Sequence, residues 1–278
     1  MITQEFQYSR PSTLNDALNL LADGSAKALA GGMSLIPAMK LRLAAPETIV
    51  DLGRIPELSY IKEDGGVIRI GAMTTHWDIE SSQLLRSKCP LLPLAAGYIG
   101  DVQVRNRGTI GGSIAHADPA ADWPASLLAV EAKVKIQAAG KSREISAEEF
   151  FVDTFTTALE PRELVTEIIV PADPAGSAYT YSKFEQPASG FAIVGIAVHV
   201  VKSGGKVSKC RVGVTGLSGK PFRAKNVEEA IEAGKPIAEA VAGIATGVDA
   251  NSDIHATGDY RKHIAKIYAR RALESALA

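Results

Sequence analysis

The chain has 278 residues, of which 46% are hydrophobic and 22% are charged, and its formal net charge is -1. Such a composition is typical of a folded globular protein of about two domains, and it gives no electrostatic reason to expect nucleic acid or an anionic membrane as a partner. No apolar run approaches the roughly 20 residues of a membrane span. The first residues also lack the pattern of a signal peptide, so we expect a cytoplasmic protein.

The two cysteines, Cys89 and Cys210, are far apart in the sequence. They are too few to hold an iron–sulfur cluster, which usually takes four thiolates. Because no group of Cys or His residues has the spacing of metal ligands, the sequence predicts no metal site.

The first part of the chain is typical of a small α/β unit over about residues 1–55. Its expected elements alternate between helix and strand, at residues 12–22, 26–30, 35–41 and 48–52. Ser12 can cap the first helix, in which leucine and alanine recur at helical spacing.

A second unit is expected over about residues 56–172, and together the two make an N-terminal domain of residues 1–172. Strands are predicted at residues 67–70, 133–137, 143–145 and 164–170, and helices at residues 77–85, 91–98 and 123–130.

The pattern changes after the linker candidate Pro171–Gly176. Three β-rich runs are expected at residues 179–184, 192–201 and 209–215, followed by helices at residues 226–233, 237–246 and 259–277. Residues 203–206 predict a hairpin turn between the second and third runs. The fold class is therefore α+β, with a C-terminal domain of residues 177–278 that combines a small antiparallel sheet with a helical cluster.

Two glycine-rich segments are the most informative features, Ala30-Gly31-Gly32-Met33-Ser34 and Thr109-Ile110-Gly111-Gly112-Ser113. Glycine permits positive φ and leaves no Cβ in the way of a ligand. Successive backbone N–H groups in such a turn form a concave anion site, to which a following helix adds its own free N–H groups. Two facing segments of this kind could hold a diphosphate without any lysine.

Other interpretations of these residues remain open at this point. A glycine pair in a turn is often purely structural, Asp118 and Asp122 can be turn or N-cap residues, and His116 is an ordinary polar loop residue on its chemistry alone. No Gly-x-Gly-x-x-Gly follows a strand, and the run at residues 213–220 fails the spacing of a phosphate loop. No Ser/His/Asp or Cys/His arrangement stands out.

Around these segments the sequence resembles the flavin-binding medium subunits of the molybdenum hydroxylases, which include xanthine dehydrogenase and aerobic carbon monoxide dehydrogenase. The resemblance is greatest to the carbon monoxide dehydrogenase type. It rests on Ala-Gly-Gly-x-Ser at residues 30–34, on Arg-Asn-x-Gly-Thr-Ile-Gly-Gly-Ser at residues 105–113, and on the segment at residues 115–122. Segments at residues 181–194, 221–224 and 256–261 match later landmarks, so the similarity covers nearly the whole chain.

The resemblance implies a two-part FAD-binding N-terminal domain of the PCMH type, with the FAD diphosphate between the two segments. The implied contacts are Ala30, Gly31, Gly32, Met33, Ser34 and Leu35 on one side, and Thr109, Ile110, Gly111, Gly112 and Ser113 on the other. Asp118, Asp122 and, by position, His116 would lie near the ribityl or ribose region. Val165 and Lys183 match positions that approach the flavin. Met33 stands where the family often has His, and the Arg and Asp common around residues 186–190 in relatives are absent.

The resemblance also implies an oxidoreductase subunit with no catalytic side chain of its own. Its partners would be a large molybdopterin-binding subunit and a small 2Fe–2S subunit, and its flavin would pass electrons to a quinone, NAD or oxygen. Two alternatives are a free-standing flavin oxidoreductase and a non-catalytic assembly subunit without flavin. Turnover by the isolated chain would favour the first, and a colourless protein that takes up no FAD would favour the second.

Overall fold

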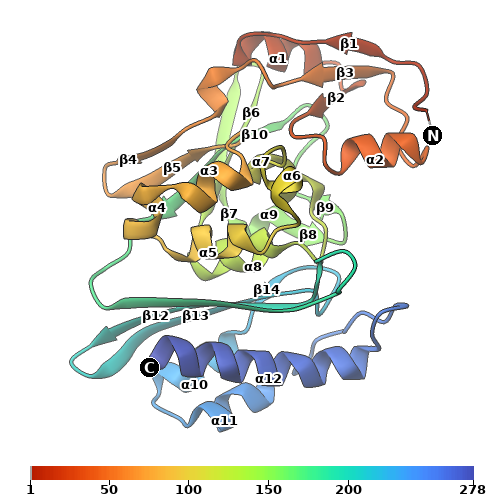
Figure 1. Ribbon diagram of the computed structural model, residues 1–278. Helices are drawn as coiled ribbons and strands as arrows, with labels where there is room; N and C mark the ends of the chain where they lie inside the picture. The colour runs from red at the N-terminus through yellow and green to blue at the C-terminus, as the bar shows by residue number, and fades with distance from the viewer. Residues whose placement is uncertain (1) are drawn as a thin grey trace.

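The computed structural model describes residues 2–278 and consists of three blocks stacked one on another (Figure 1). The N-terminal block, at the top of the view, is a parallel sheet in the order β1-β3-β2. Its elements are β1 (Gln7–Ser9), α1 (Leu14–Leu21), β2 (Ala26–Leu29), α2 (Leu35–Lys40) and β3 (Thr48–Asp51). A helix between successive strands allows parallel pairing, which confirms the expected α/β unit.

The cap of α1 differs from the prediction. The hydroxyl of Thr13, not that of Ser12, accepts a hydrogen bond from the Asp16 N–H, at 3.2 Å. The helix therefore begins at Leu14, and it buries Leu18 and Leu21 in the small core of this block.

The middle block contains an antiparallel sheet in the order β4-β5-β10-β6-β7. Its strands are β4 (Ile61–Asp64), β5 (Val67–Gly71), β6 (Lys133–Ala138), β7 (Lys141–Ser146) and β10 (Leu164–Pro171). Central strand β10 confirms the strand expected at residues 164–170, and it is buried from Leu164 to Val170, including the polar Thr166 and Glu167. A short hairpin, β8 (Phe151–Asp153) with β9 (Thr156–Thr157), lies beside the sheet.

Short helices pack with this sheet around one large core. They are η1 (Pro56–Leu58), α3 (His76–Ser81), α4 (Gln83–Lys88), α5 (Leu91–Gly97), α6 (Val102–Arg105), α7 (Ile110–His116), α8 (Asp122–Ala129) and α9 (Ala147–Phe150). The single helix expected at residues 77–85 is wrong, because the chain is extended at Ser82 and the Ser82 hydroxyl caps a new helix. Gly111 and Gly112 lie inside α7 rather than in a loop.

The C-terminal block is an antiparallel sheet in the order β11-β12-β13-β14 with helices on one face (Figure 1). Its elements are β11 (Ser177–Glu185), β12 (Ala192–Ser203), β13 (Lys206–Thr215), β14 (Phe222–Arg223), α10 (Lys225–Glu232), α11 (Ile237–Ala240), η2 (Val241–Gly243) and α12 (Gly258–Leu277). Ser203 pairs with Lys206, so the predicted hairpin is confirmed. The helix expected at residues 237–246 is wrong, because only Ile237–Ala240 is α-helical.

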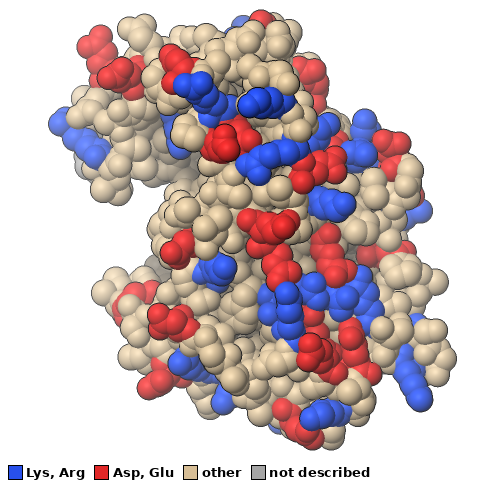
Figure 2. Space-filling model, turned by 180° about the vertical axis from the view of Figure 1, so that it is seen from behind, with Lys and Arg blue, Asp and Glu red and all other residues tan. Residues whose placement is uncertain are grey.

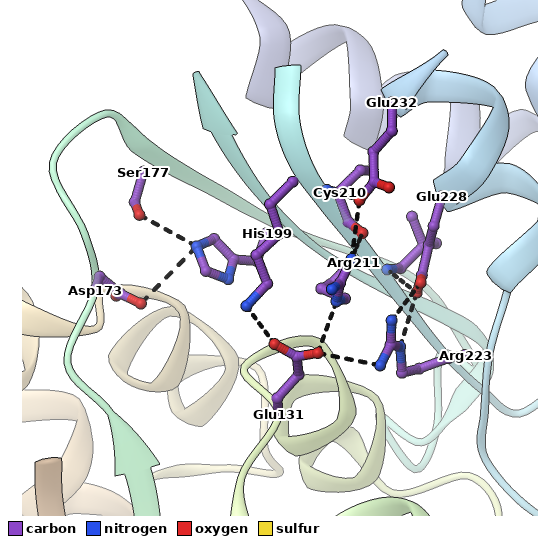
Figure 3. Close-up of polar contacts among 11 residues, drawn as sticks. Glu131, Asp173, Ser177, His199, Cys210, Arg211, Arg223, Glu228 and Glu232 are labelled. Carbon is purple, nitrogen blue, oxygen red and sulfur yellow. Dashed lines mark hydrogen bonds and ion pairs between the residues drawn. The ribbon is translucent and has the colours of Figure 1, made fainter. Parts of the chain in front are cut away.

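A carboxylate joins the middle block to the C-terminal block. Glu131, just after α8, accepts from Arg211 Nε at 2.8 Å and from Arg223 Nη1 at 3.2 Å (Figure 3). It also pairs with Lys209. These cations come from β13 and β14. Because several cations share one half-buried carboxylate, the network fixes how the C-terminal sheet sits on α8.

Candidate functional site

The first glycine segment forms the turn between β2 and α2. Gly32 has a φ of +79°, the left-handed region that the sequence analysis anticipated for such a turn. A Cβ on Gly31 would lie 2.0 Å from the carbonyl oxygen of Arg107, and a Cβ on Gly32 would lie 2.6 Å from Ile36 Cδ1. Neither position can therefore carry a larger side chain without a shift of its surroundings.

The same segment leaves a run of backbone donors free. Within residues 2–278, the N–H groups of residues 31–35 donate to no acceptor, and the first hydrogen bond after them runs from Ile36 N to Gly32 O, at 3.1 Å. The Ser34 side chain forms no capping bond at the start of α2. Since Met33 and Ser34 are exposed, this part of the run is accessible to a ligand. Unpaired, closely spaced N–H groups of this kind suit an anion.

The second glycine segment is different, and here the expected free N–H groups are absent. Gly111 N donates to Ala72 O at 2.9 Å, Ile110 N donates to Thr74 O at 3.1 Å, and Gly112 N donates to the Thr109 hydroxyl at 3.1 Å. Ser113 N completes the first turn of α7 by donating to Thr109 O. The prediction of a second anion site made of free backbone N–H groups is therefore wrong for residues 110–113. The sequence could not reveal this, because it does not show which carbonyl groups a neighbouring segment brings to these N–H groups.

The glycines of the second segment serve close packing. A Cβ on Gly111 would lie 2.5 Å from Ala72 Cβ, and one on Gly112 would lie 3.2 Å from Ala30 Cβ. Gly31 likewise abuts Arg107 and Gly108. The two segments thus lie against each other, where the N-terminal block meets the middle block. From behind, Figure 2 shows the surface hollowed at its left edge below the N-terminal block.

Two expected flavin contacts, Asp122 and Lys183, are paired with each other. Asp122 opens α8 and is only 5% exposed, and Lys183 on β11 lies with its Nζ 3.1 Å from Asp122 Oδ1. The Tyr181 hydroxyl also donates to Asp122. Burial raises the pKa of Asp122 to about 6, while the nearby Lys183 charge opposes that rise.

Lys183 has two further acceptors. Its Nζ donates to the carbonyl of Gly190 at 2.6 Å and to that of Tyr98 at 2.7 Å. The ammonium group therefore joins α8, the end of α5 and the loop after β11. Sequence reasoning missed Tyr181 as a partner of Asp122, although residues 181 and 183 share one face of a strand and so point the same way.

The other predicted residues lie around the second segment. The Asp118 carboxylate accepts from Ala120 N at 2.8 Å, which is the turn role considered from the sequence. His116 ends α7 with its ring centroid 5.0 Å from that of Phe155, and burial lowers the pKa of the imidazole. Val165 is buried and precedes Thr166, whose carbonyl accepts from the N–H of Ala72.

A small polar cluster outside these segments contains Ser177, His199 and Asp173 (Figure 3). Both the Ser177 hydroxyl, at 3.2 Å, and the Asp173 carboxylate, at 3.9 Å, approach the same imidazole nitrogen, Nε2 of His199. A catalytic triad needs the serine and the carboxylate on opposite nitrogens. These residues are therefore not a hydrolase site, in agreement with the sequence analysis.

Comparison with known proteins identifies the family. Residues 4–173 match the family model "FAD binding domain in molybdopterin dehydrogenase", and residues 179–276 match "CO dehydrogenase flavoprotein C-terminal domain". The chain belongs to the FAD-binding medium subunits of the molybdenum hydroxylases. The first of these two family models describes an FAD-binding domain, so FAD is the cofactor of this N-terminal domain. The chain is an oxidoreductase component.

Several relatives match this chain along nearly their whole length. The chain is 39% identical to the carbon monoxide dehydrogenase medium chain of Hydrogenophaga pseudoflava, covering 100% of this chain and 99% of that one. It is 37% identical to the glyceraldehyde dehydrogenase medium chain of Sulfolobus acidocaldarius, covering 99% of each. The fold matches quinoline 2-oxidoreductase of Pseudomonas putida 86 with a TM-score of 0.93 at 29% identity, covering 100% of this chain and 98% of that one.

Two further properties concern residues 2–278 as the structure describes them. Within that range, no helix is both long and apolar enough to cross a membrane. The same residues contain no group of three or more His, Cys, Asp or Glu side chains placed to hold a metal ion.

Proposed function

We propose that the chain holds FAD through the first glycine segment and relays electrons from an iron–sulfur partner to an external acceptor. The free N–H groups of residues 31–35 carry this proposal, because an uncharged backbone run with no internal acceptor suits the diphosphate of a dinucleotide. The hydroxyl of Ser34 adds a donor beside them. When bound, FAD supplies the chemistry, since a flavin can take up and release electrons one or two at a time.

The second glycine segment does not offer a second set of free N–H groups, and we propose that it instead forms a rigid wall opposite the first segment. Its satisfied N–H groups fix α7 firmly, and Gly111 and Gly112 let this helix approach Ala72 and Ala30 closely. We propose that Thr109, Ile110, Gly111, Gly112 and Ser113 form the opposite wall of the diphosphate site, with the exposed side of the Ser113 side chain toward the ligand. Asp118, His116 and Val165 surround this wall and are proposed to line the rest of the FAD site.

Asp122 and Lys183 are proposed to hold neighbouring segments in place rather than to contact the flavin chemically. Their buried pair, with the carbonyls of Tyr98 and Gly190, holds the loop after β11 against α5. That loop would carry its backbone to the flavin from the C-terminal block. No chemical step needs either residue to change its charge.

The partners of this subunit are proposed from its relatives. The two relatives described above are each named the medium chain of a dehydrogenase, a name that implies further chains. We therefore propose a large molybdopterin-binding subunit and a small 2Fe–2S subunit as partners. The match to an FAD-binding domain of molybdopterin dehydrogenases supports a substrate site on that large subunit. A quinone, NAD and oxygen are the candidate acceptors.

The decisive experiment compares ligands that share an isoalloxazine but differ in phosphate. The purified chain, stripped of flavin, should take up FAD and become yellow, and it should bind riboflavin far more weakly because riboflavin has no diphosphate. Equal affinity for both would contradict the diphosphate site. Turnover by the isolated chain would instead favour a free-standing oxidoreductase, and failure to bind any flavin would favour an assembly subunit.

A further inference from the structure

Met33 places a thioether within the first glycine segment. The residue is 40% exposed, so dissolved oxidants can reach its sulfur atom. Among residues 2–278 it is the only exposed methionine, because Met39 is 6% exposed and Met73 packs, partly buried, against the core of the N-terminal block. This difference in access directs an oxidant to Met33 before the other two methionines.

The two cysteines do not compete for such an oxidant. Cys89 and Cys210 are both fully buried. Burial also raises the pKa of both thiols, that of Cys210 to about 12, so neither provides the thiolate that reacts with peroxides. A thioether needs no deprotonation before it reacts. The Met33 sulfur is therefore the one in residues 2–278 that a peroxide meets first.

The backbone around Met33 makes a single added oxygen atom important. The N–H groups of residues 31–35 donate to no acceptor within residues 2–278. A sulfoxide oxygen is a far stronger hydrogen-bond acceptor than a thioether, which accepts only weakly. It also stands at the end of a flexible side chain, which can turn back onto the N–H groups of its own segment. An oxidised Met33 would then occupy donors that an anionic ligand needs.

We propose that Met33 is a redox-sensitive residue, at which hydrogen peroxide forms methionine sulfoxide and thereby weakens the binding of FAD. The thioether sulfur attacks one oxygen of the peroxide, the O–O bond breaks, and a new S–O bond forms. The sulfur is oxidised by two electrons and the peroxide is reduced by two. The departing hydroxide takes the proton from the transferred hydroxyl group and leaves as water, so the reaction needs no further reactant.

The inference rests on the proposed function, since the ligand that the sulfoxide would displace is the FAD diphosphate. Oxygen is one of the candidate acceptors, and its reduction by two electrons yields hydrogen peroxide. A subunit that passes electrons to oxygen would thus form the oxidant beside Met33 and lose flavin as the sulfoxide accumulates. Because methionine sulfoxide is reduced again by dedicated reductases, the loss of flavin would be reversible.

Treatment of the full-length, FAD-free chain with hydrogen peroxide, followed by peptide mass spectrometry and fluorescence titration with FAD, tests the proposal. At a dose that converts Met33 to the sulfoxide, Met39 should remain mainly unoxidised. FAD binding should weaken about fivefold to tenfold, the effect of displacing one internal hydrogen bond. Methionine sulfoxide reductases of both stereospecificities, added together, should then restore the affinity.

Two leucine variants show whether the Met33 sulfur is responsible, each compared with its own untreated sample. Met33→Leu should have the same FAD affinity before and after peroxide, whereas Met39→Leu, the matched control in α2, should lose affinity as the unaltered chain does. Faster oxidation of Met39 than of Met33 would overturn the inference. So would unchanged FAD affinity after Met33 is oxidised, or an equal loss of affinity in Met33→Leu. Failure of the untreated chain to bind FAD would instead count against the proposed function.

Discussion

The two glycine segments look alike in the sequence but differ in what their backbone does. In the first, five successive N–H groups find no acceptor within residues 2–278. In the second, the N–H groups of residues 110–113 are all satisfied, and the glycines instead allow α7 to approach its neighbours. The same glycine motif therefore has two roles: the first segment has free N–H groups for a ligand, and the second segment packs closely and holds its surroundings in place. Substitutions in the two should accordingly affect different quantities.

The largest effect is expected from placing a negative charge in the first segment. Met33 is 40% exposed, so Met33→Asp should fold, but its carboxylate would repel the FAD diphosphate. Repulsion near a protein surface of about 2–3 kcal/mol corresponds to roughly a hundredfold weaker FAD binding. Fluorescence titration with FAD measures the change.

Two controls isolate the effect of charge at residue 33. Met33→Asn introduces a side chain of the same shape as aspartate but without its charge, and this variant should retain most of the affinity for FAD. Leu43→Asp adds the same charge at a position of the N-terminal block that is 79% exposed, and it should have little effect. Equal FAD affinity in the Asp and Asn variants of Met33 would contradict an anion site here.

A methyl group in the second segment should reduce stability instead. The Cβ of Gly111→Ala would lie 2.5 Å from Ala72 Cβ and 2.7 Å from Ala72 O, and overpacking of this kind lowers the free energy of unfolding by about 2 kcal/mol. Urea denaturation measures it. Gly97→Ala is the matched control in another short helix, because its Cβ meets Glu80 at an ordinary 3.5 Å and helix propensity favours alanine. Equal stabilities of the two variants would refute the packing role.

Asp122, which follows the second segment, should make the free energy of unfolding depend on pH. Burial raises the pKa of Asp122 to about 6, above the value of about 4 expected in the unfolded chain. The folded protein therefore binds this proton more tightly, and the stabilising contribution is complete below about pH 4 and is lost as the pH rises through about 6. Relative to Asp122→Asn, the unaltered chain should gain about 2 kcal/mol between pH 7 and pH 4. Denaturation curves of the two proteins that stay parallel across this range would contradict it.

Much of this arrangement could be predicted from the sequence, because helical and strand periodicities are local. The mostly apolar run of β10, closed by Pro171, and the turn at residues 203–206 were sufficient to place their elements. The break at Ser82 was missed, since the apolar pattern continues across it while the serine side chain caps a new helix. The sequence also could not show that the N–H groups of Ile110 and Gly111 are hydrogen-bonded. Their acceptors are the carbonyls of Thr74 and Ala72, which tertiary packing brings to them.

The smallest effects should come from the hydroxyls of the two segments, and they give the sharpest contrast. Thr109→Val removes the oxygen that caps α7, so it should lower the free energy of unfolding by about 1 kcal/mol while folded molecules keep their FAD affinity. Ser34→Ala removes no capping bond, so its stability should be unchanged, but one donor to the diphosphate is lost. That loss of about 1 kcal/mol corresponds to roughly fivefold weaker FAD binding. Thermal melts without FAD and titrations with FAD separate the two quantities. If Thr109→Val weakened FAD binding without changing the melting temperature, the second segment would itself be a binding segment, and the division between the two would fail.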